Sequence, residues 1–291
     1  MMRAAQARGH AVWACEQPQL HWLKGRVCAN ATRLSLTDND EDWYRSHESQ
    51  TRPLAEFDAV LMRKDPPFDL EYVASTWLLS IAVREGARVF NAPDAIRDHN
   101  EKLAIAEFAP FVAPTLVSRE PARIQSFIEE QRDVVVKRLD VMGGENIFRV
   151  RADDPNRNVI VEIMSQGSSR TVMAQRYIPE IAQGDKRVLL IDGEAVPHCL
   201  ARIPKPGESR GNLAAGARGV AQPLSARHRE IAAAVGPALA KRGLLLVGLD
   251  IIGDWLTEVN VTSPTCFREI QDQTGFEVAG RFLQALEAKI E

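Results

Sequence analysis

The pattern of apolar and polar positions in the first hundred residues predicts strands that alternate with a helix. AEFDAVLMR (55–63) is an apolar run typical of a buried strand, and the two prolines of KDPPFD end it. LEYVASTWLLSIAVREG (70–86) has helical spacing up to a glycine, and ARVFN follows as a further strand. Strand, helix and strand in succession form a βαβ unit, so we expect an open α/β layer in this third of the chain.

The first residues predict that this layer is incomplete. Residues 1–8 have the pattern of the end of a helix, Gly9 stops it, and RGHAVWAC supplies a strand. A short hairpin is expected around Gly25, followed by an acidic surface turn at TDNDEDWYRS. An α/β layer of this type ordinarily has a strand before such a helix. We therefore expect its first strand to be missing, within a segment of roughly two dozen residues.

Helical and strand periodicities continue through the rest of the chain. Helices are predicted at 92–111, which carries Lys102, and at 120–132, 225–243 and 275–291. Strands are predicted at 113–119, at both ends of 133–151, at 171–181, and in a hairpin over 185–203 that turns at Asp192-Gly193.

Composition narrows the class of protein. Of 291 residues, 45% are hydrophobic and 26% are charged, which is typical of a globular protein. The net charge of −3 and the lack of a long basic run argue against a nucleic-acid partner. No apolar run reaches the roughly 20 residues that span a bilayer, and the first ten residues lack a signal-peptide core. Four scattered cysteines without CxxC favour a reduced, cytoplasmic protein, and the histidines lack zinc spacing.

Polar side chains interrupt two apolar runs near the C-terminus, in VGLDIIGDWLTEVNVTSPT (247–265). Glu258 and Asn260 are two residues apart and share one face of a strand. Together with Asp250 they offer three oxygen ligands, which suit a hard divalent cation such as Mg²⁺ or Mn²⁺. A polar strand edge that faces solvent remains the alternative.

The register of this hairpin gives a geometric test. A regular hairpin with a two-residue loop at 253–254 would pair Asp250 with Thr257 and turn it away from Glu258. An odd loop or a bulge would restore the alignment. We predict that Asp250 and Glu258 are cross-strand neighbours on one face.

Two other stretches offer contacts for an anion. Lys137 ends an apolar strand before Met142-Gly143-Gly144, and such glycines let backbone N–H groups approach phosphate oxygens. A hairpin with a surface lysine explains the same residues equally well. PKPGESRGNLAAGARG (204–219) combines arginines with glycines, as mobile lids do. A flexible linker is the alternative there.

A third stretch, MAQRYIPE (173–180), is a strand that runs into a connector, where an adenine could stack and bond to the backbone. When this stretch is considered alone, packing in the core is the better explanation for it.

The order of these features resembles that of the ATP-grasp ligases, and longer stretches resemble bacterial glutathione synthetases. These stretches are VLMRKDPPFD, HNEKL, MGG-NIFRV, GDKRVL, CLARIP, RGNLAAG, VGLDIIGD and TEVNVTSPTC-REI. The resemblance covers the whole chain and implies a fold of class α/β and α+β. It implies an N-terminal substrate-side domain over 1–100, the open α/β layer without its first strand. A two-part ATP-grasp fold would follow, with subdomains at 101–178 and 179–291 and a lid loop at 203–218.

The resemblance also implies an activity and roles for residues. The enzyme would join γ-glutamylcysteine to glycine with ATP and Mg²⁺ or Mn²⁺, through an acyl phosphate, and would form a homodimer or homotetramer. ATP would be held by Lys102, Lys137, Gly143, Gly144, Gln175, Tyr177, Ile178 and Asp185. The metal ligands would be Asp250, Glu258 and Asn260. The basic groups at the dipeptide and the transferring phosphate would be Arg187, Arg202 and Arg210, and further substrate contacts would come from Ser263, Thr265 and Arg268.

Three positions depart from the family pattern. Arg138 stands where a proline is expected, Val141 where a glycine precedes Met-Gly-Gly, and Ala217 where the lid has a second glycine. A β-branched residue at a position with positive φ would be strained by about 1–3 kcal/mol. Two alternatives therefore stay open: an ATP-grasp ligase with other substrates, and a truncated nucleotide-binding paralogue without catalysis.

Overall fold

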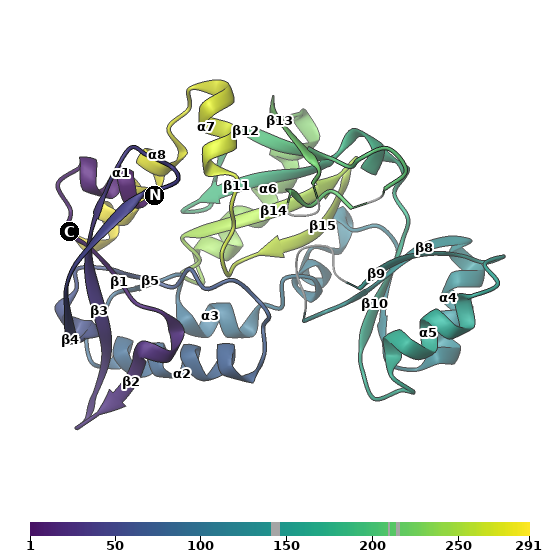
Figure 1. The fold of residues 1–291 in the computed structure, drawn as a ribbon. Helices are drawn as coiled ribbons and strands as arrows, with labels where there is room; N and C mark the ends of the chain where they lie inside the picture. The colour runs from purple at the N-terminus through teal and green to yellow at the C-terminus, as the bar shows by residue number, and fades with distance from the viewer. Residues whose placement is uncertain (141–145, 209, 214–215) are drawn as a thin grey trace.

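The computed structural model describes residues 1–140, 146–208, 210–213 and 216–291. The predicted phosphate-binding glycines Gly143 and Gly144, and Val141, lie outside this part of the chain. In the described part, an antiparallel sheet occupies one end of the molecule, and the helices α4 and α5 with their own sheet occupy the other (Figure 1).

The N-terminal region is mostly antiparallel, which corrects the expectation of an open α/β layer there. After α1 (Met2–Ala7), its sheet has the order β1-β3-β2, with β4 also paired to β3. Its strands are β1 (Val12–Ala14), β2 (Leu20–Leu23), β3 (Arg26–Leu36) and β4 (Tyr44–Pro53). The hairpin around Gly25 is confirmed, since Leu23 pairs with Arg26. The predicted acidic turn is shorter than expected because β4 already begins at Tyr44.

The predicted βαβ unit is confirmed beside this sheet. β5 (Val60–Leu61) and β6 (Val89–Phe90) pair in parallel and are joined by α2 (Leu70–Arg84). Asp69 caps α2 by accepting a hydrogen bond from the backbone N–H of Tyr72. Over the described residues β5 and β6 pair only with each other.

The single helix predicted for 92–111 is wrong. α3 (Pro93–Asp98) ends before His99, and a 3₁₀ segment, η3 (Leu103–Phe111), follows. Asn100 explains the break because its side-chain oxygen accepts hydrogen bonds from the backbone N–H groups of Lys102 and Leu103, which competes with helical bonding. Lys102 consequently lies at the start of η3 and is buried.

A second sheet has the order β7-β10-β8-β9 and carries α4 and α5 on one face. Its elements are β7 (Thr115–Ser118), α4 (Pro121–Gln131), β8 (Asp133–Arg138), β9 (Ile147–Arg151), α5 (Arg157–Ser165) and β10 (Val172–Arg176). The apolar side chains of Ile124, Ile128, Val161 and Met164 pack between the two helices and the strands. The sequence patterns predicted α4 but missed α5.

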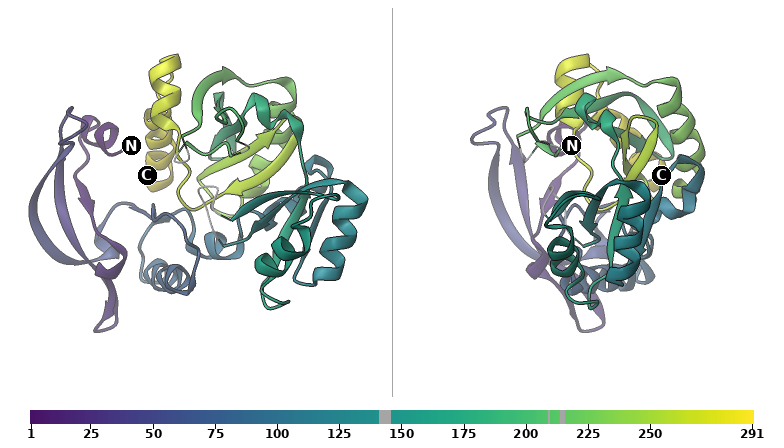
Figure 2. Two further views of the ribbon diagram at one scale, coloured as in Figure 1. Left: turned by 45° about the vertical axis from the view of Figure 1, so that its right-hand side comes forward. Right: turned by 90° about the vertical axis from the view of Figure 1, so that its right-hand side faces the viewer.

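The sheet that carries the predicted metal ligands has the antiparallel order β13-β12-β11-β14-β15. Its strands are β11 (Asp185–Ile191), β12 (Glu194–Ile203), β13 (Arg218–Pro223), β14 (Leu246–Ile252) and β15 (Trp255–Asn260). The associated helices are α6 (Ala226–Ala240), α7 (Phe267–Thr274) and α8 (Val278–Ile290), of which α7 was not predicted. The left-hand view of Figure 2 shows this sheet between the two ends of the molecule.

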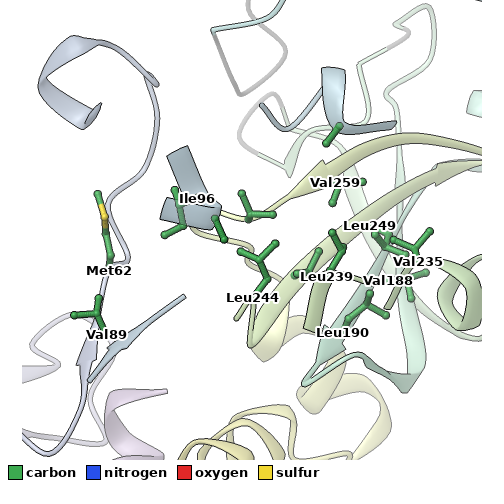
Figure 3. Packing of buried hydrophobic residues seen from close by; sticks show 14 of the residues in the cluster. Met62, Val89, Ile96, Val188, Leu190, Val235, Leu239, Leu244, Leu249 and Val259 are labelled. Atoms are coloured by element: carbon green, nitrogen blue, oxygen red, sulfur yellow. The ribbon is translucent and has the colours of Figure 1, made fainter. Parts of the chain in front are cut away.

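One apolar core joins the N-terminal region to the β11–β15 sheet. It extends from Met62 and Val89 through Ile96 and Leu244 to Val188 on β11 (Figure 3). In the described chain, no helix is both long and apolar enough to cross a membrane.

Candidate active site

The β14–β15 hairpin has the register that the sequence analysis required. Its loop has two residues, since Ile252 pairs with Trp255, and the next pair is Ile251 with Leu256. A bulge then passes over Thr257, so that Asp250 pairs with Glu258. The predicted cross-strand neighbours are therefore confirmed, and they are produced by the bulge.

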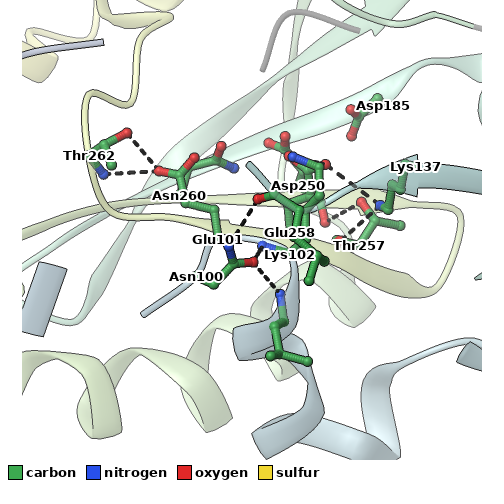
Figure 4. Close-up of polar contacts among 12 residues, drawn as sticks. Asn100, Glu101, Lys102, Lys137, Asp185, Asp250, Thr257, Glu258, Asn260 and Thr262 are labelled. Atoms are coloured by element: carbon green, nitrogen blue, oxygen red, sulfur yellow. Dashed lines mark hydrogen bonds and ion pairs between the residues drawn. The ribbon is translucent and has the colours of Figure 1, made fainter. Parts of the chain in front are cut away.

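Two buried lysines from different elements approach Glu258. The Nζ atom of Lys102, at the start of η3, lies 3.8 Å from Glu258 Oε1, and that of Lys137, on β8, lies 3.6 Å from the same oxygen (Figure 4). Each lysine is only 5% exposed. Burial opposes ionisation of Glu258, but the two ammonium groups outweigh it and lower the pKa of the carboxyl group. Burial lowers the pKa of Lys137 in turn.

Two arginines converge on Asp250 on the same face. Arg187, on β11, donates to both carboxylate oxygens at 2.5 and 3.0 Å, and Arg202 Nη2, on β12, lies 2.9 Å from Oδ2. Arg202 also donates to Asp185. Burial opposes ionisation of Asp250, yet the guanidinium groups of Arg187 and Arg202 lower the pKa of its carboxyl well below the ordinary range. The result is a buried cluster of alternating charges beside the lysine pair.

Two polar atoms of this cluster are buried without a hydrogen-bond partner among the described residues. They are Asp185 Oδ1 and Arg202 Nε. Burial raises the pKa of Asp185 to about 7 despite its contact with Arg202. Because unpaired buried polar atoms cost stability in a folded chain, they point to a place where a bound molecule completes the hydrogen bonding.

The proposed metal ligands lie close together, but they are not equivalent. Asn260 donates its amide nitrogen to Gly248 O, at 3.1 Å, which leaves its oxygen as the group suited to a cation. Both oxygens of Asp250 already accept hydrogen bonds from arginine. Since the described residues contain no group of three or more Asp, Glu, His or Cys arranged for a metal ion, Asn260 is needed to complete the donor set. The oxygen-only donors fit Mg²⁺ or Mn²⁺.

The connector after β10 contains the residues predicted to meet adenine. Gln175 is buried and donates to Thr115 Oγ1, and Ile178 is buried as well. The ring of Tyr177 lies under the guanidinium of Arg149, whose central carbon is 3.6 Å from the ring centroid. The backbone N–H of Tyr177 donates to Asp133 O, so it is already engaged.

The described part of the predicted lid approaches the charge cluster at one glycine. A Cβ atom on Gly211 would lie 2.9 Å from Asp185 Cβ and 3.0 Å from Arg202 O, so only glycine fits there. Arg210 is exposed and pairs with Glu208 on the same loop, 2.9 Å away. The structure therefore does not bring Arg210 to Arg187 and Arg202.

The three residues predicted to contact substrate beyond β15 separate in space. Ser263 donates to Asp65 of the N-terminal region, while Thr265 is exposed. Arg268, at the start of α7, is an exposed residue that pairs with Asp40. Arg268 therefore contacts the N-terminal region through α7, and Ser263 lies at the junction between that region and the segment directly after β15.

Sequence reasoning missed two residues at that junction. Glu101 Oε1 accepts hydrogen bonds from the backbone N–H groups of Val261 and Thr262 and from Thr262 Oγ1, which fixes the chain directly after Asn260 (Figure 4). Arg63 donates to Pro264 O. Both belong to stretches already singled out, HNEKL and VLMRKDPPFD, but nothing local assigned them a contact.

Comparisons with known proteins agree over the full chain. A family model described as "Prokaryotic glutathione synthetase, N-terminal domain" matches residues 1–97, and one described as "Prokaryotic glutathione synthetase, ATP-grasp domain" matches residues 101–275. The glutathione synthetase of Ralstonia nicotianae is 62% identical over 99% of this chain and 89% of its own length. That of Pseudomonas aeruginosa is 51% identical over 100% of this chain and 92% of its own length.

Solved structures share the fold at lower identity. The ATP-grasp ligase PsnB, complexed with a minimal precursor, aligns with a TM-score of 0.63 at 17% identity, over 99% of this chain and 93% of that one. The D-cycloserine synthetase DcsG aligns with a TM-score of 0.64 at 20% identity, over 82% of this chain and 86% of that one.

Proposed function

The chain belongs to the prokaryotic glutathione synthetase family, and from that premise we propose how its residues divide the work of the reaction. It is an ATP-grasp ligase that joins γ-glutamylcysteine to glycine. The roles of single residues and of the metal ion are our proposals, and so are the limits of the domains.

We assign the nucleotide phosphates to Lys102 and Lys137. The observation that carries this assignment is their convergence on Glu258, because two ammonium groups and a carboxylate are buried at one point. Without nucleotide, Glu258 supplies the countercharge for the lysines. When a triphosphate enters, its oxygens replace part of that charge, and Glu258 becomes available to a cation. Mg²⁺ or Mn²⁺ held by Glu258, Asn260 and Asp250 would neutralise charge that develops on the phosphoryl oxygens.

The arginine cluster is suited to the dipeptide carboxylate that receives the phosphoryl group. This carboxylate attacks the γ-phosphate of ATP, ADP leaves, and the glycine amine then displaces phosphate from the acyl phosphate. The Nε–H of Arg202 has no partner among the described residues and Arg187 lies beside it, which supports a role for both in orienting anionic groups. No covalent bond to the protein is needed, and the chain acts by positioning and electrostatics.

The loop 203–218 is assigned the exclusion of water, which would hydrolyse an acyl phosphate. Its support is the close approach of Gly211, a described residue of this loop, to Asp185 and Arg202 of the charge cluster. Arg210 would have to leave Glu208 to reach the phosphate, so its role depends on movement of the loop. Adenine contacts at Gln175, Tyr177 and Ile178, a cytoplasmic location, and a dimer or tetramer remain predictions.

The assignment is tested with Glu258→Gln, which keeps the size of the side chain and removes its charge. We expect phosphate release in the presence of ATP, γ-glutamylcysteine and glycine to fall on the order of 100-fold or more, with an unchanged circular dichroism spectrum. Glu194→Gln, an exposed carboxylate of β12, is the matched control and should retain activity. An active Glu258→Gln enzyme would contradict the proposed site.

The same assay checks the dipeptide and the amine. Phosphate release from ATP should require both substrates, so omission of either γ-glutamylcysteine or glycine should abolish it. Tight ATP binding without turnover by the parent protein would contradict catalysis.

A further inference from the structure

One residue from another element covers the outer edge of β15. β15 is the last strand of its sheet, so its backbone N–H groups on the side away from β14 meet no further strand among the described residues. Glu101 accepts two of these groups. Its carbonyl oxygen accepts from Val259 N–H at 2.8 Å, and its side-chain Oε1 accepts from Val261 N–H, directly after the strand, at 2.9 Å. Glu101 therefore holds the chain on both sides of Asn260.

The side chain of Glu101 also fixes the next residue. Oε1 accepts from the backbone N–H of Thr262 at 3.0 Å and from its Oγ1 at 2.7 Å, so three donors share this oxygen (Figure 4). Burial raises the pKa of the Glu101 carboxyl group, and the hydrogen bonds from Thr262 act in the opposite direction. The protonated and the ionised carboxyl group both offer an acceptor oxygen, so the contacts themselves do not require its charge.

Asn260 depends on these contacts because it is the last residue of β15. Its pairing with Gly248 is the final pair of the hairpin, and its amide nitrogen donates to Gly248 O. Beyond this pair, Glu101 supplies the hydrogen bonds that hold the backbone in place. The direction of the amide oxygen, which the proposed site offers to a cation, follows from the backbone that carries it.

Glu101 is also joined directly to the lysine that we assign to the nucleotide phosphates. Lys102 is the next residue, and its Nζ lies 3.8 Å from Glu258 Oε1. On the other side, Asn100 accepts from Lys102 N–H at 3.2 Å and donates to Leu139 O, after β8, at 2.9 Å. These three consecutive residues thus contact the chain after β8, the end of β15 and the carboxylate of Glu258.

We propose that Glu101 is a positioning residue that holds the amide oxygen of Asn260, and through it the divalent cation, at a fixed place relative to Lys102. Glu101 itself contacts neither the nucleotide nor the cation. The inference rests on the nucleotide and metal roles proposed above. It gives Lys102 and the metal ligands a common support, so that nucleotide and cation bind as one unit.

Direct binding of the cation by Glu101 fits the contacts less well. Its Oε1 is already shared by three donors. The described residues also contain no group of three or more Asp, Glu, His or Cys that could hold a metal ion, so Glu101 does not extend the carboxylates into such a group. Residues that orient a metal ligand without touching the metal commonly contribute to its affinity in this way.

The experiment measures the binding of a non-hydrolysable ATP analogue to the full chain by calorimetry, with Mg²⁺ and with EDTA in its place. Glu101→Ala should lose about 10-fold or more in affinity with Mg²⁺, the usual effect of removing such a partner. Without the metal its affinity should stay close to that of the parent, because the bond from Val259 to the carbonyl of residue 101 does not need the side chain. The Mg²⁺ concentration for half-maximal phosphate release should rise by a similar factor.

Two further variants separate the hydrogen bonds from the charge. Glu101→Gln keeps an acceptor oxygen at the same reach and should bind the analogue with Mg²⁺ nearly as tightly as the parent. Glu101→Asp keeps the charge but shortens the side chain by one methylene group, so it should show the metal-dependent loss. It also provides the test if Glu101→Ala does not fold.

Glu85→Ala is the matched control. Glu85 is also half-buried, and its Oε2 accepts from the backbone N–H of a distant strand residue, Val27, at 2.8 Å. Its loss should lower thermal stability, as the loss of Glu101 should, because each leaves a backbone donor without this acceptor. The metal-dependent affinity should change only in the Glu101 variants.

The outcomes distinguish this inference from the proposed function. Equal losses with and without Mg²⁺, or no loss, in Glu101→Ala and Glu101→Asp would overturn the positioning role. A loss in Glu101→Gln as large as in Glu101→Ala would overturn it as well, since the charge would then be what acts. A parent that binds the analogue and releases phosphate independently of Mg²⁺ would instead remove the metal site itself.

Discussion

Asp250 holds together the buried charges of the site at the scale of single residues. Its oxygens accept hydrogen bonds from Arg187 and lie close to Arg202, and all three residues are at most 6% exposed. Taking such charges out of water is costly, and only their mutual contacts offset the cost. The sequence analysis gave Asp250 a single role, that of a metal ligand. The structure adds that this carboxylate also neutralises two arginines, which a local pattern does not reveal.

Asp250→Asn should therefore destabilise the fold itself. Removing one partner of a buried charge group leaves the arginines uncompensated, and we expect the free energy of unfolding at pH 7 to fall by about 3–5 kcal/mol in urea denaturation. Because the pKa of Asp250 is lowered in the folded state, its contribution is present above the ordinary pKa of 3.8 and is lost as the pH falls below it.

The variant should accordingly lose less stability than the parent on acidification. Asp254→Asn, an exposed residue in the loop of the same hairpin, is the control and should behave like the parent. Equal stability of Asp250→Asn and Asp254→Asn at pH 7 would show that the fold does not require the ion pairs of Asp250 with Arg187 and Arg202.

Close backbone approach decides how elements pack. α6 lies against the turn of the β11–β12 hairpin, where a Cβ atom on Gly236 would be 2.0 Å from Gly193 O. The hairpin itself was predicted from Asp192-Gly193, since that dipeptide is typical of such turns. The contact with α6 was not predictable, because a glycine in a helical pattern ordinarily only lowers helix propensity.

Gly236→Ala should consequently destabilise the protein by about 1–3 kcal/mol, since a backbone atom blocks the new methyl group. Gly280→Ala is the matched comparison in α8, where a Cβ atom would meet nothing closer than 3.4 Å. There the substitution should raise the free energy of unfolding by about 0.5–1 kcal/mol, because alanine lowers the backbone entropy of the unfolded chain. Thermal denaturation of both variants should show shifts of opposite sign; shifts of the same sign would argue that helix propensity, not the close approach, sets the outcome.

The whole molecule depends on contacts between the N-terminal region and the β11–β15 sheet. Asn91, just after β6, donates to Leu246 O and Val261 O and accepts from the backbone N–H of Leu246. Around it runs the apolar core that includes Met62, Val89 and Leu244. These contacts hold the N-terminal region against β14 and the residue that follows β15, next to the proposed metal ligands.

Asn91→Asp keeps the shape of this side chain and replaces its donor by an acceptor. Two backbone carbonyls would lose their partner, so we expect a loss of about 2–5 kcal/mol in the free energy of unfolding. Asn156→Asp, at an exposed position before α5, is the control and should stay within about 0.5 kcal/mol of the parent. An unchanged midpoint for Asn91→Asp would mean that the junction is held by apolar packing alone.

Local patterns in the sequence determined much of this protein. The hairpins at Gly25 and Asp192-Gly193, and the pairing of Asp250 with Glu258, followed from periodicity and register because those properties involve neighbouring residues. The sequence left open whether an odd loop or a bulge produces that pairing, and the structure shows the bulge. The break at Asn100 was missed because a side-chain hydrogen bond overrode a helical pattern.

The tertiary structure alone decided which charges meet. Lys102, Lys137 and Glu258 come from three elements, and Arg63 and Pro264 are 201 positions apart. Partners at such separations are chosen by the packing of whole sheets, in which burial leaves each charge only the neighbours that the fold brings to it. The residue types were therefore legible in the sequence, whereas their pairing was a property of the folded chain.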